Sequence, residues 1–418
     1  MHFRFWLLLG LGAFPLWANG DRLSPLAPRP VWQELAAFQE SVTREEFERL
    51  LEKVYAPGGA ARGLIEVREN RVEIVKSVGA AEKVTVRLAK DAASVKPGPR
   101  FWRTAAELPT RPTERPLAGL RVALDPGHLG GDWARMEERW FRLGESTPVR
   151  EGDMALRVAE RLTPLLTNLG AEVLHVRHAP GPTTPQRPAD FRRPAREILS
   201  ANGMPRPREG YRATDDPGRG GTVQFQSELL FYRMAEIRHR ARVVNEELQP
   251  DVVLCLHFNA EAWGAPEQPE FTPRNHLHVL VNGCYAASEL RLDDMRHDLL
   301  IRLLSGITGP EQALAGRMAS VFARRAALPP WIYPGTNATR VSDNPYLWAR
   351  NLLANRLYRC PVVFLEPYVM NNQEVWERVQ AGDYEGERTV AGSLRASIFR
   401  EYAETVAEGL AEAFRPAK

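Results

Sequence analysis

The sequence predicts an α/β fold with a mostly parallel twisted sheet flanked by helices, preceded by a small N-terminal α+β module. From Leu117 onward, apolar strand-like runs alternate with helical patterns, which is the order of a parallel sheet with crossover helices. Before that point one helical pattern precedes two alternating runs, and prolines then mark a linker. The apolar fraction of 44% and the charged fraction of 26% are those of a globular protein.

Residues 1–20 have the pattern of a secretory signal peptide. His2 and Arg4 precede an apolar run at 5–17, and Ala18 and Gly20 suit a signal peptidase. An uncleaved anchor is the alternative, but the run is short for a membrane span. We therefore expect an exported protein, periplasmic or extracellular, with no membrane span after cleavage.

Charge and cysteine content narrow the function classes further. The formal net charge of +3 is too small to indicate nucleic-acid binding. Three cysteines are too few for a disulfide framework, and none is paired at metal-ligand spacing. Cys255 and Cys360 lie in or beside apolar strand-like runs, so we expect buried thiols. One disulfide is the alternative in an oxidising compartment.

Residues 27–115 form the predicted N-terminal module. The segment 32–55 has helical apolar spacing, with Thr43 as N-cap and Glu46 three residues later. Segments 63–78 and 82–89 alternate like strands. Wall targeting, partner docking and scaffolding all remain open as the role of this module.

Residues 117–415 form the predicted main domain. The elements expected there, in chain order, are strand 119–125, helix 151–169, strand 171–177, helix 230–248, strand 251–256, strand 276–283, strand 360–366 and helix 394–414. Pro164 predicts a kink in the first of these helices, and Gly170 ends it.

Two insertions interrupt this order. Residues 179–221 are rich in proline, glycine and arginine, and we expect a long loop there, either solvated or in contact with an acidic ligand. Residues 285–311 predict an extra helix.

Polar residues gather where the predicted strands end, the edge of a parallel sheet at which ligands bind. They are Asp125, His128, His257, Asn259 and Glu366. A further candidate, Glu151, begins the helix that packs beside these strands. Two histidines and a carboxylate make a zinc site with one open position, and a second carboxylate then serves as general base. The alternative is a buried core histidine with carboxylates that cap helices.

Four segments resemble the motifs of the zinc-dependent N-acetylmuramoyl-L-alanine amidases, a family of cell-wall amidases (amidase_3 type). VALDPGHLGGD at 122–132 is similar to the motif with the first zinc ligand, which implies His128. REGDMALRVAERL at 150–162 is similar to the helix that the second ligand opens, which implies Glu151. Glu145 is the competing choice, but the residues after it do not fit.

The other two motifs follow in the same order. CLHFNA at 255–260 resembles the motif with the third ligand, which implies His257, and VFLEPYVMNNQEV at 363–375 resembles the motif with the catalytic carboxylate, which implies Glu366. Asp125 is expected either to hold His128 in its tautomer or only to cap the turn. Asn259 is expected either to orient substrate or a ligand or to have a structural role in the turn. The resemblance implies a phosphorylase/hydrolase-like fold, bound Zn²⁺, peptidoglycan as substrate and an activator protein as a further partner. It also leaves open that the helix at 285–311 covers the site as a plug, as a similarly placed helix does in relatives, or only packs beside it.

The chain departs from the family pattern around these motifs without losing a ligand. Leu129 stands where the family usually has glycine, and the segment 132–146 is longer and more aromatic than usual. Two other functions therefore stay open: a zinc peptidase of carboxypeptidase-like fold that cleaves another amide, and a non-catalytic cell-wall binding protein.

Overall fold

The computed structural model describes residues 22–213 and 215–415. The predicted signal peptide at 1–20 lies outside these residues. Within them, every helix is too short or too polar to cross a membrane.

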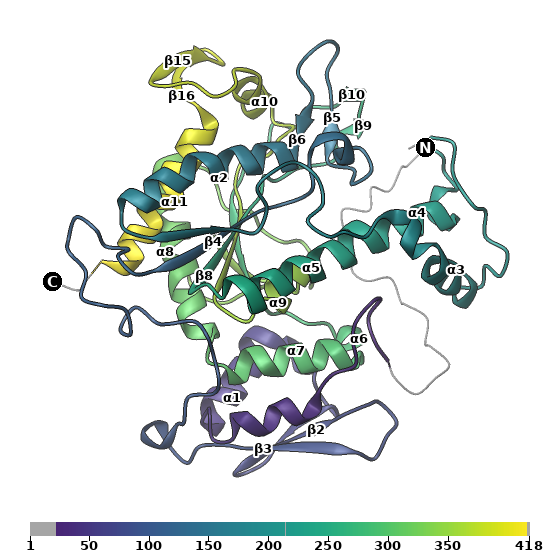
Figure 1. Cartoon of the computed structure of the whole chain (residues 1–418), viewed down its shortest axis with the longest axis vertical. Coiled ribbons are helices and arrows are strands. Elements are labelled where there is room, and N and C mark those ends of the chain that lie inside the picture. Colours follow the sequence, from purple (N-terminus) through teal and green to yellow (C-terminus); the bar gives the residue numbers. More distant parts are fainter. Residues whose placement is uncertain (1–21, 214, 416–418) are drawn as a thin grey trace.

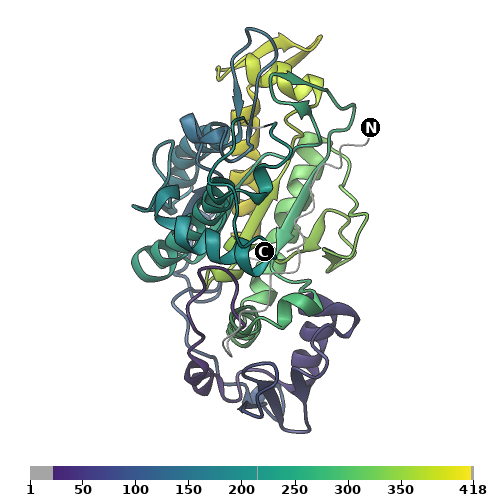
Figure 2. The same cartoon turned by 90° about the vertical axis from the view of Figure 1, so that its right-hand side faces the viewer.

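The N-terminal module consists of several short helical elements and a three-stranded antiparallel sheet. Its elements are η1 (Trp32–Phe38), α1 (Arg44–Leu50), η2 (Leu51–Tyr55), η3 (Pro57–Gly59), β1 (Ile65–Val67), β2 (Arg71–Val75), β3 (Lys83–Arg87) and η4 (Ala92–Ser94). The Thr43 side chain accepts a hydrogen bond from the Glu46 amide at 3.3 Å, so the predicted N-cap is confirmed. In both views the module lies at the lower end of the molecule (Figures 1 and 2).

A seven-stranded sheet forms the centre of the main domain (Figure 1). Its strands, in order across the sheet, are β12 (Thr339–Arg340), β13 (Leu347–Ala349), β11 (His278–Val281), β14 (Val362–Glu366), β8 (Val252–Leu256), β4 (Arg121–Pro126) and β7 (Glu172–His175). Four of the neighbouring pairs are parallel, while β11 with β14 and β12 with β13 are antiparallel. The predicted mostly parallel sheet is confirmed.

Helices cover both faces of this sheet because its central strands are apolar on both faces. One face packs against α2 (Glu151–Asn168), α8 (Thr308–Ala326) and α11 (Ile398–Phe414). The other face packs against α5 (Glu236–Arg242), η9 (Val243–Leu248) and α9 (Leu353–Leu357). Alternation along β4 shows the division: Val122 and Leu124 join the first core, and Ala123 joins the second.

The proline- and arginine-rich insertion is partly helical, so the prediction of a long loop was wrong over 188–201. It contains η6 (Pro188–Phe191) and α3 (Arg192–Ala201), and η7 (Arg219–Gly221) precedes α4 (Val223–Leu229) and η8 (Leu230–Ala235). Phe191, Ala195 and Ile198 lie on one apolar face. In the sequence, the arginines and the proline between them interrupt the apolar periodicity that would have predicted this helix. Leu129, the departure next to His128, is fully buried in the core of this helical lobe.

The extra helix predicted at 285–311 exists as α7 (Asp293–Leu304), preceded by α6 (Ala287–Leu290). It packs against η1 and α9, between the sheet and the N-terminal module (Figure 1). Arg296 of this helix donates to the carbonyl oxygens of Val75 and Lys76 in the module, at 2.8 and 2.7 Å. These contacts make α7 a bridge between the two parts of the chain, and its action as a plug stays a prediction.

Smaller elements complete the main domain. They are η5 (Gly131–Ala134), the hairpins β5–β6 (Trp140–Phe141, Val149–Arg150), β9–β10 (Gly264–Ala265, Gln268–Pro269) and β15–β16 (Glu387–Val390, Ser393–Ala396), and the helix α10 (Gln373–Gln380). The last helix was predicted to begin at Leu394, but β16 ends at Ala396 and α11 begins at Ile398, so the predicted start was wrong. The three cysteines are free and buried, as predicted for Cys255 and Cys360.

Candidate metal centre

His128 lies in a tight turn directly after β4. Its backbone φ of 60° is in the left-handed region, which only a few per cent of non-glycine residues adopt. The preceding Gly127 makes the turn compatible with His257, because a Cβ at this position would lie 2.2 Å from the imidazole Cε1. The Pro-Gly-His sequence therefore allows two imidazoles to approach each other, with ring centroids 5.0 Å apart.

Glu151 is the first residue of α2 and is almost fully buried. The next residue, Gly152, lies against the His128 loop so closely that a Cβ would be 2.3 Å from the Gly130 nitrogen. Gly130 in turn has a φ of 72° and faces Asp153, whose Oδ1 accepts from the Gly131 amide at 2.6 Å. Glycines on both segments thus bring Glu151 beside His128.

His257 follows β8, and contacts from two sides fix its position. Its ring stacks on Phe364 of the neighbouring strand β14, with centroids 4.3 Å apart and an interplanar angle of 18°. The Tyr402 hydroxyl of α11 donates to the His257 carbonyl oxygen at 3.1 Å. The buried apolar strand before His257 therefore serves as a rigid support for the imidazole.

These three residues form a compact ligand set. The Glu151 carboxylate lies 3.2 Å (Oε2) from His128 Nε2 and 3.1 Å (Oε1) from His257 Nδ1. One ligand atom from each residue lies within 4.8 Å of the others. Ligands about 2.0–2.1 Å from a tetrahedral zinc are separated by roughly 3.3 Å, so the two histidine–glutamate separations suit this ion. The two imidazoles keep 20% and 14% of their surface exposed, which leaves one side of the set open.

Glu366 ends β14, directly beside the metal ligands. The backbone register pairs Leu365 with Leu256, so Glu366 is the neighbour of His257 across the parallel strands. Burial, followed by the charge of Glu151, raises the pKa of Glu366 to about 8. Without a metal this carboxyl therefore holds its proton near neutral pH, and a bound cation favours the ionised form.

The metal-free ligand set resembles a buried ion pair. Burial opposes the charged imidazole of His128, but Glu151 and Glu137 outweigh it and raise its pKa to about 9. Burial also opposes ionisation of Glu151, and the charge of His128 outweighs that and lowers the pKa of the carboxyl. A metal that binds His128 must displace this proton.

We expect the metal-free protein to lose stability as pH rises from about 6.5 to 8. His128 and Glu366 both have pKa values that are higher in the folded chain than in the unfolded chain, so their protonation stabilises the fold at low pH and this stabilisation is lost with rising pH. The decline should be on the order of 1 kcal/mol per pH unit. Urea unfolding of chelator-treated protein measures it, with Glu366→Gln as a variant of shallower slope. An unfolding free energy that rises over this window would contradict the assigned shifts.

Two residues of the segment 132–146 reach the ligands, and the sequence patterns did not identify them. Buried Glu137 lies 3.5 Å from His128 Nδ1 and accepts from the Leu129 amide at 2.7 Å. It therefore orients the imidazole, as carboxylate partners of metal-bound histidines do. Arg139 lies 3.2 Å from Glu151. Its positive charge partly offsets the burial and the Glu151 charge that together raise the pKa of Glu366. The unusual aromatic connection before α2 thus contributes to the site.

Asp125 lies beside the His128 turn, and its contacts favour the turn-capping alternative over a contact with the imidazole. Its carboxylate accepts from Arg240 Nη1 at 2.9 Å and from the Tyr358 hydroxyl at 2.5 Å. Arg240 also donates to the His128 carbonyl oxygen at 2.9 Å. The partner of the His128 ring is Glu137, so Asp125 acts on the turn through Arg240 and not on the imidazole.

Asn259 holds the segment that follows Glu366. Its backbone N–H donates to the carbonyl oxygens of Pro367 and Tyr368. Its backbone carbonyl oxygen accepts from the backbone N–H of Met370 at 2.8 Å. Its side-chain Nδ2 lies 3.3 Å from Nδ1 of His278. Since these contacts occupy the side chain and the backbone, they favour an orienting role for Asn259 over direct substrate binding.

Comparisons with known proteins give distant structural similarity alone. No protein-family model and no curated protein sequence matches the chain. Among solved structures, Ami1, an N-acetylmuramyl-L-alanine amidase from Mycobacterium smegmatis, is 17% identical with a TM-score of 0.38, over 71% of this chain and 98% of Ami1. The CwlD amidase from Clostridioides difficile, solved in complex with the GerS lipoprotein, is 12% identical with a TM-score of 0.38, over 71% of this chain and 98% of CwlD.

A third match is AmiC2 of Nostoc punctiforme, an N-acetylmuramoyl-L-alanine amidase. It is 15% identical with a TM-score of 0.34, over 71% of this chain and 96% of AmiC2. The matched solved structures named here are thus amidases of one kind. At these identities and TM-scores the likeness is distant, and the function of this chain rests on its own site residues.

Proposed function

We propose that this protein is a zinc-dependent hydrolase that cleaves the amide bond between N-acetylmuramic acid and L-alanine in peptidoglycan. The observation that carries the proposal is the convergence of His128, Glu151 and His257, with ligand atoms within 4.8 Å of one another, beside Glu366. An open set of two histidines and one carboxylate is typical of catalytic zinc, whereas structural zinc sites have four protein ligands.

In this proposal the two imidazoles and the Glu151 carboxylate hold the zinc ion. When bound, zinc polarises the substrate carbonyl and lowers the pKa of water to about 7. Glu137 keeps the His128 ring oriented by accepting from its Nδ1–H. The exposed edge of the two imidazoles, 20% and 14% of their side-chain surfaces, is the side from which the substrate approaches.

Glu366 is the general base and then the general acid. Its carboxylate takes the proton of the attacking water and returns it to the nitrogen of the leaving L-alanine amine. A pKa near neutral suits a group that must accept and donate a proton in one turnover, and burial beside Glu151 raises the pKa of Glu366 in this direction. Arg139, which contacts Glu151 at 3.2 Å, places a positive charge close enough to act on Glu366.

The choice of amide rests on the four sequence motifs at 122–132, 150–162, 255–260 and 363–375. Peptidoglycan is the substrate that the resemblance implies, and it lies outside the cytoplasm. This agrees with the predicted export of the chain to the periplasm or the exterior. The activator protein stays a prediction of the same resemblance.

The cleaved bond can be identified directly. Purified cell wall should yield free stem peptides that begin with L-alanine, together with glycan strands that carry unsubstituted lactyl groups. Mass spectrometry of the digest, with and without a chelator, measures both products. Cleavage at another amide would point to the zinc peptidase alternative. Binding to cell wall without any released peptide would point to the non-catalytic alternative.

A further inference from the structure

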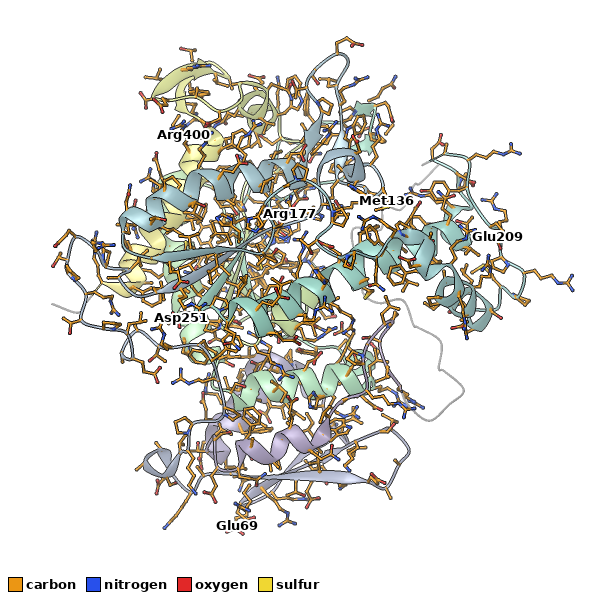
Figure 3. The ribbon with its side chains drawn as sticks, viewed as in Figure 1. Glu69, Met136, Arg177, Glu209, Asp251 and Arg400 are labelled. Carbon is orange, nitrogen blue, oxygen red and sulfur yellow. The ribbon has the colours of Figure 1, made fainter. Side chains whose placement is uncertain are left out.

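One buried guanidinium joins the two segments that carry the proposed metal ligands. Arg177 follows β7 and is only 2% exposed. Its Nη2 donates to the carbonyl oxygen of Gly127 at 3.2 Å, in the His128 turn, and to that of Gly152 at 2.8 Å, in the first turn of α2. Its Nε and Nη1 donate to the carbonyl oxygens of Pro126 at 3.3 Å and Ala179 at 2.9 Å. In Figure 3 Arg177 lies in the interior of the molecule, near the beginning of α2.

This arginine is unusual because its acceptors are carbonyl groups. Among the described residues, no carboxylate oxygen lies within 4.0 Å of its guanidinium, although the carboxylates of Asp125, Glu137 and Glu236 act on it from farther away. Burial, followed by the charge of Arg240, lowers its pKa to about 10. A buried charge of this kind adds little stability compared with an apolar side chain of similar size. Its contacts nevertheless converge on the two ligand segments.

Those segments need an external support because glycine dominates them. Gly127, Gly130 and Gly152 leave room for close approach but provide no side chains that fix the backbone. His128 is held at a φ of 60°, a conformation that the surroundings must impose. The hydrogen bonds to the carbonyl oxygens therefore decide where the ligand atoms lie.

Arg240 supports only one of the two segments. It donates to the carbonyl oxygens of Pro126 and His128, both at 2.9 Å, and its charge is balanced by Asp125 and Glu236. No hydrogen bond from Arg240 to α2 occurs among the described residues. The Gly131 amide and the Asp153 side chain also join the two segments. Among the described residues, Arg177 is the side chain that hydrogen-bonds to the carbonyl oxygens of both residues adjacent to the ligands, Gly127 and Gly152.

We propose that Arg177 is a positioning residue of the metal centre: its planar fork fixes the separation of the His128 and Glu151 ligand atoms and thereby sets the affinity for zinc. The inference rests on the proposed function to the extent that the three ligands bind a metal. Both bonds that join the segments come from Nη2, and the bonds from Nε to Pro126 and from Nη1 to Ala179 hold this nitrogen in place. Lysine cannot replace this arrangement, because an ammonium group has no further planar donors that fix its position.

The test compares zinc affinity in Arg177→Lys and Arg177→Met with that of the wild type, by competition with a chromophoric chelator. We expect both variants to bind zinc about 10- to 100-fold more weakly, the range seen when the outer supports of metal ligands are removed. The visible absorption spectrum of the cobalt-substituted protein should also change, since it depends on ligand geometry. Arg177→Met leaves no unpaired charge, which makes it the variant suited to folding if lysine is not tolerated.

Arg296→Lys is the matched control. Arg296 is also buried and donates to three carbonyl oxygens, those of Val75, Leu290 and Lys76, but it lies in α7 at the N-terminal module. It should lower thermal stability without changing zinc affinity or the cobalt spectrum. A folded Arg177 variant with wild-type zinc affinity and an unchanged spectrum would overturn the inference. A wild-type protein that binds no zinc would instead overturn the metal centre itself, and the proposed function with it.

Discussion

Replacement of Glu366 by glutamine is expected to lower kcat by about 10²- to 10⁴-fold, the usual contribution of a general base. Glutamine has nearly the same shape but cannot accept the proton of the attacking water. Glu366 is not one of the three clustered ligand residues, so bound zinc should be retained. Release of stem peptides from cell wall, measured with the zinc content of the same sample, tests both expectations.

Glu387→Gln provides the control for this variant, because Glu387 is an exposed glutamate on the β15–β16 hairpin. It should retain wild-type activity. Full activity of Glu366→Gln would rule out the proposed base. Loss of zinc from that variant would show that Glu366 supports the ligands, and the drop in kcat would then have a different cause.

Replacement of Glu151 by glutamine is expected to abolish detectable activity together with zinc binding. The carboxylate is the only anionic ligand of the set, and it contacts both imidazoles at 3.2 and 3.1 Å. Since zinc binding with four protein ligands is worth about 10–16 kcal/mol, the loss of one ligand should weaken the affinity by about 10²- to 10³-fold or more. Metal analysis after dialysis measures this directly.

Glu145→Gln is the matched control for Glu151→Gln. Glu145 lies six positions earlier and is exposed, and it was the competing ligand in the sequence. It should keep both zinc and activity. If Glu145→Gln lost zinc while Glu151→Gln retained it, the ligand assignment would be wrong.

The Glu151→Gln variant should also have a lower pKa at His128 than the wild type. Glu151 is the larger of the two negative charges that raise this pKa, and glutamine removes it.

The sequence was sufficient to predict the alternating elements of the main domain. The apolar runs at 122–124, 252–256 and 362–365 are buried on both faces of a sheet, and such runs are recognisable without any tertiary information. The positions of Asp125, His257 and Glu366 at or just beyond the ends of those runs follow from the same pattern. The Thr43 cap and the buried thiols of Cys255 and Cys360 were local features of the same kind.

Other elements were missed because their signals conflicted. The apolar face of α3 was hidden in the sequence by arginines and prolines. Pro164 lies inside one continuous helix, α2, and the kink at this proline stays a prediction. The antiparallel pairing of β11 with β14 depends on contacts between distant segments, which no local pattern encodes. The beginning of the closing helix was misplaced, since 387–396 forms a hairpin there.

What the sequence by itself determined is the set of candidate ligands and the strands and helix that carry them. Only the tertiary structure decided how they are held: Glu137 at the His128 ring, Arg139 at Glu151, and Arg177 between the two ligand segments. The physical reason lies in the range of each interaction. Hydrophobic periodicity is a property of neighbouring residues, whereas a hydrogen bond from Arg177 to Gly152 joins positions that only the folded chain brings together.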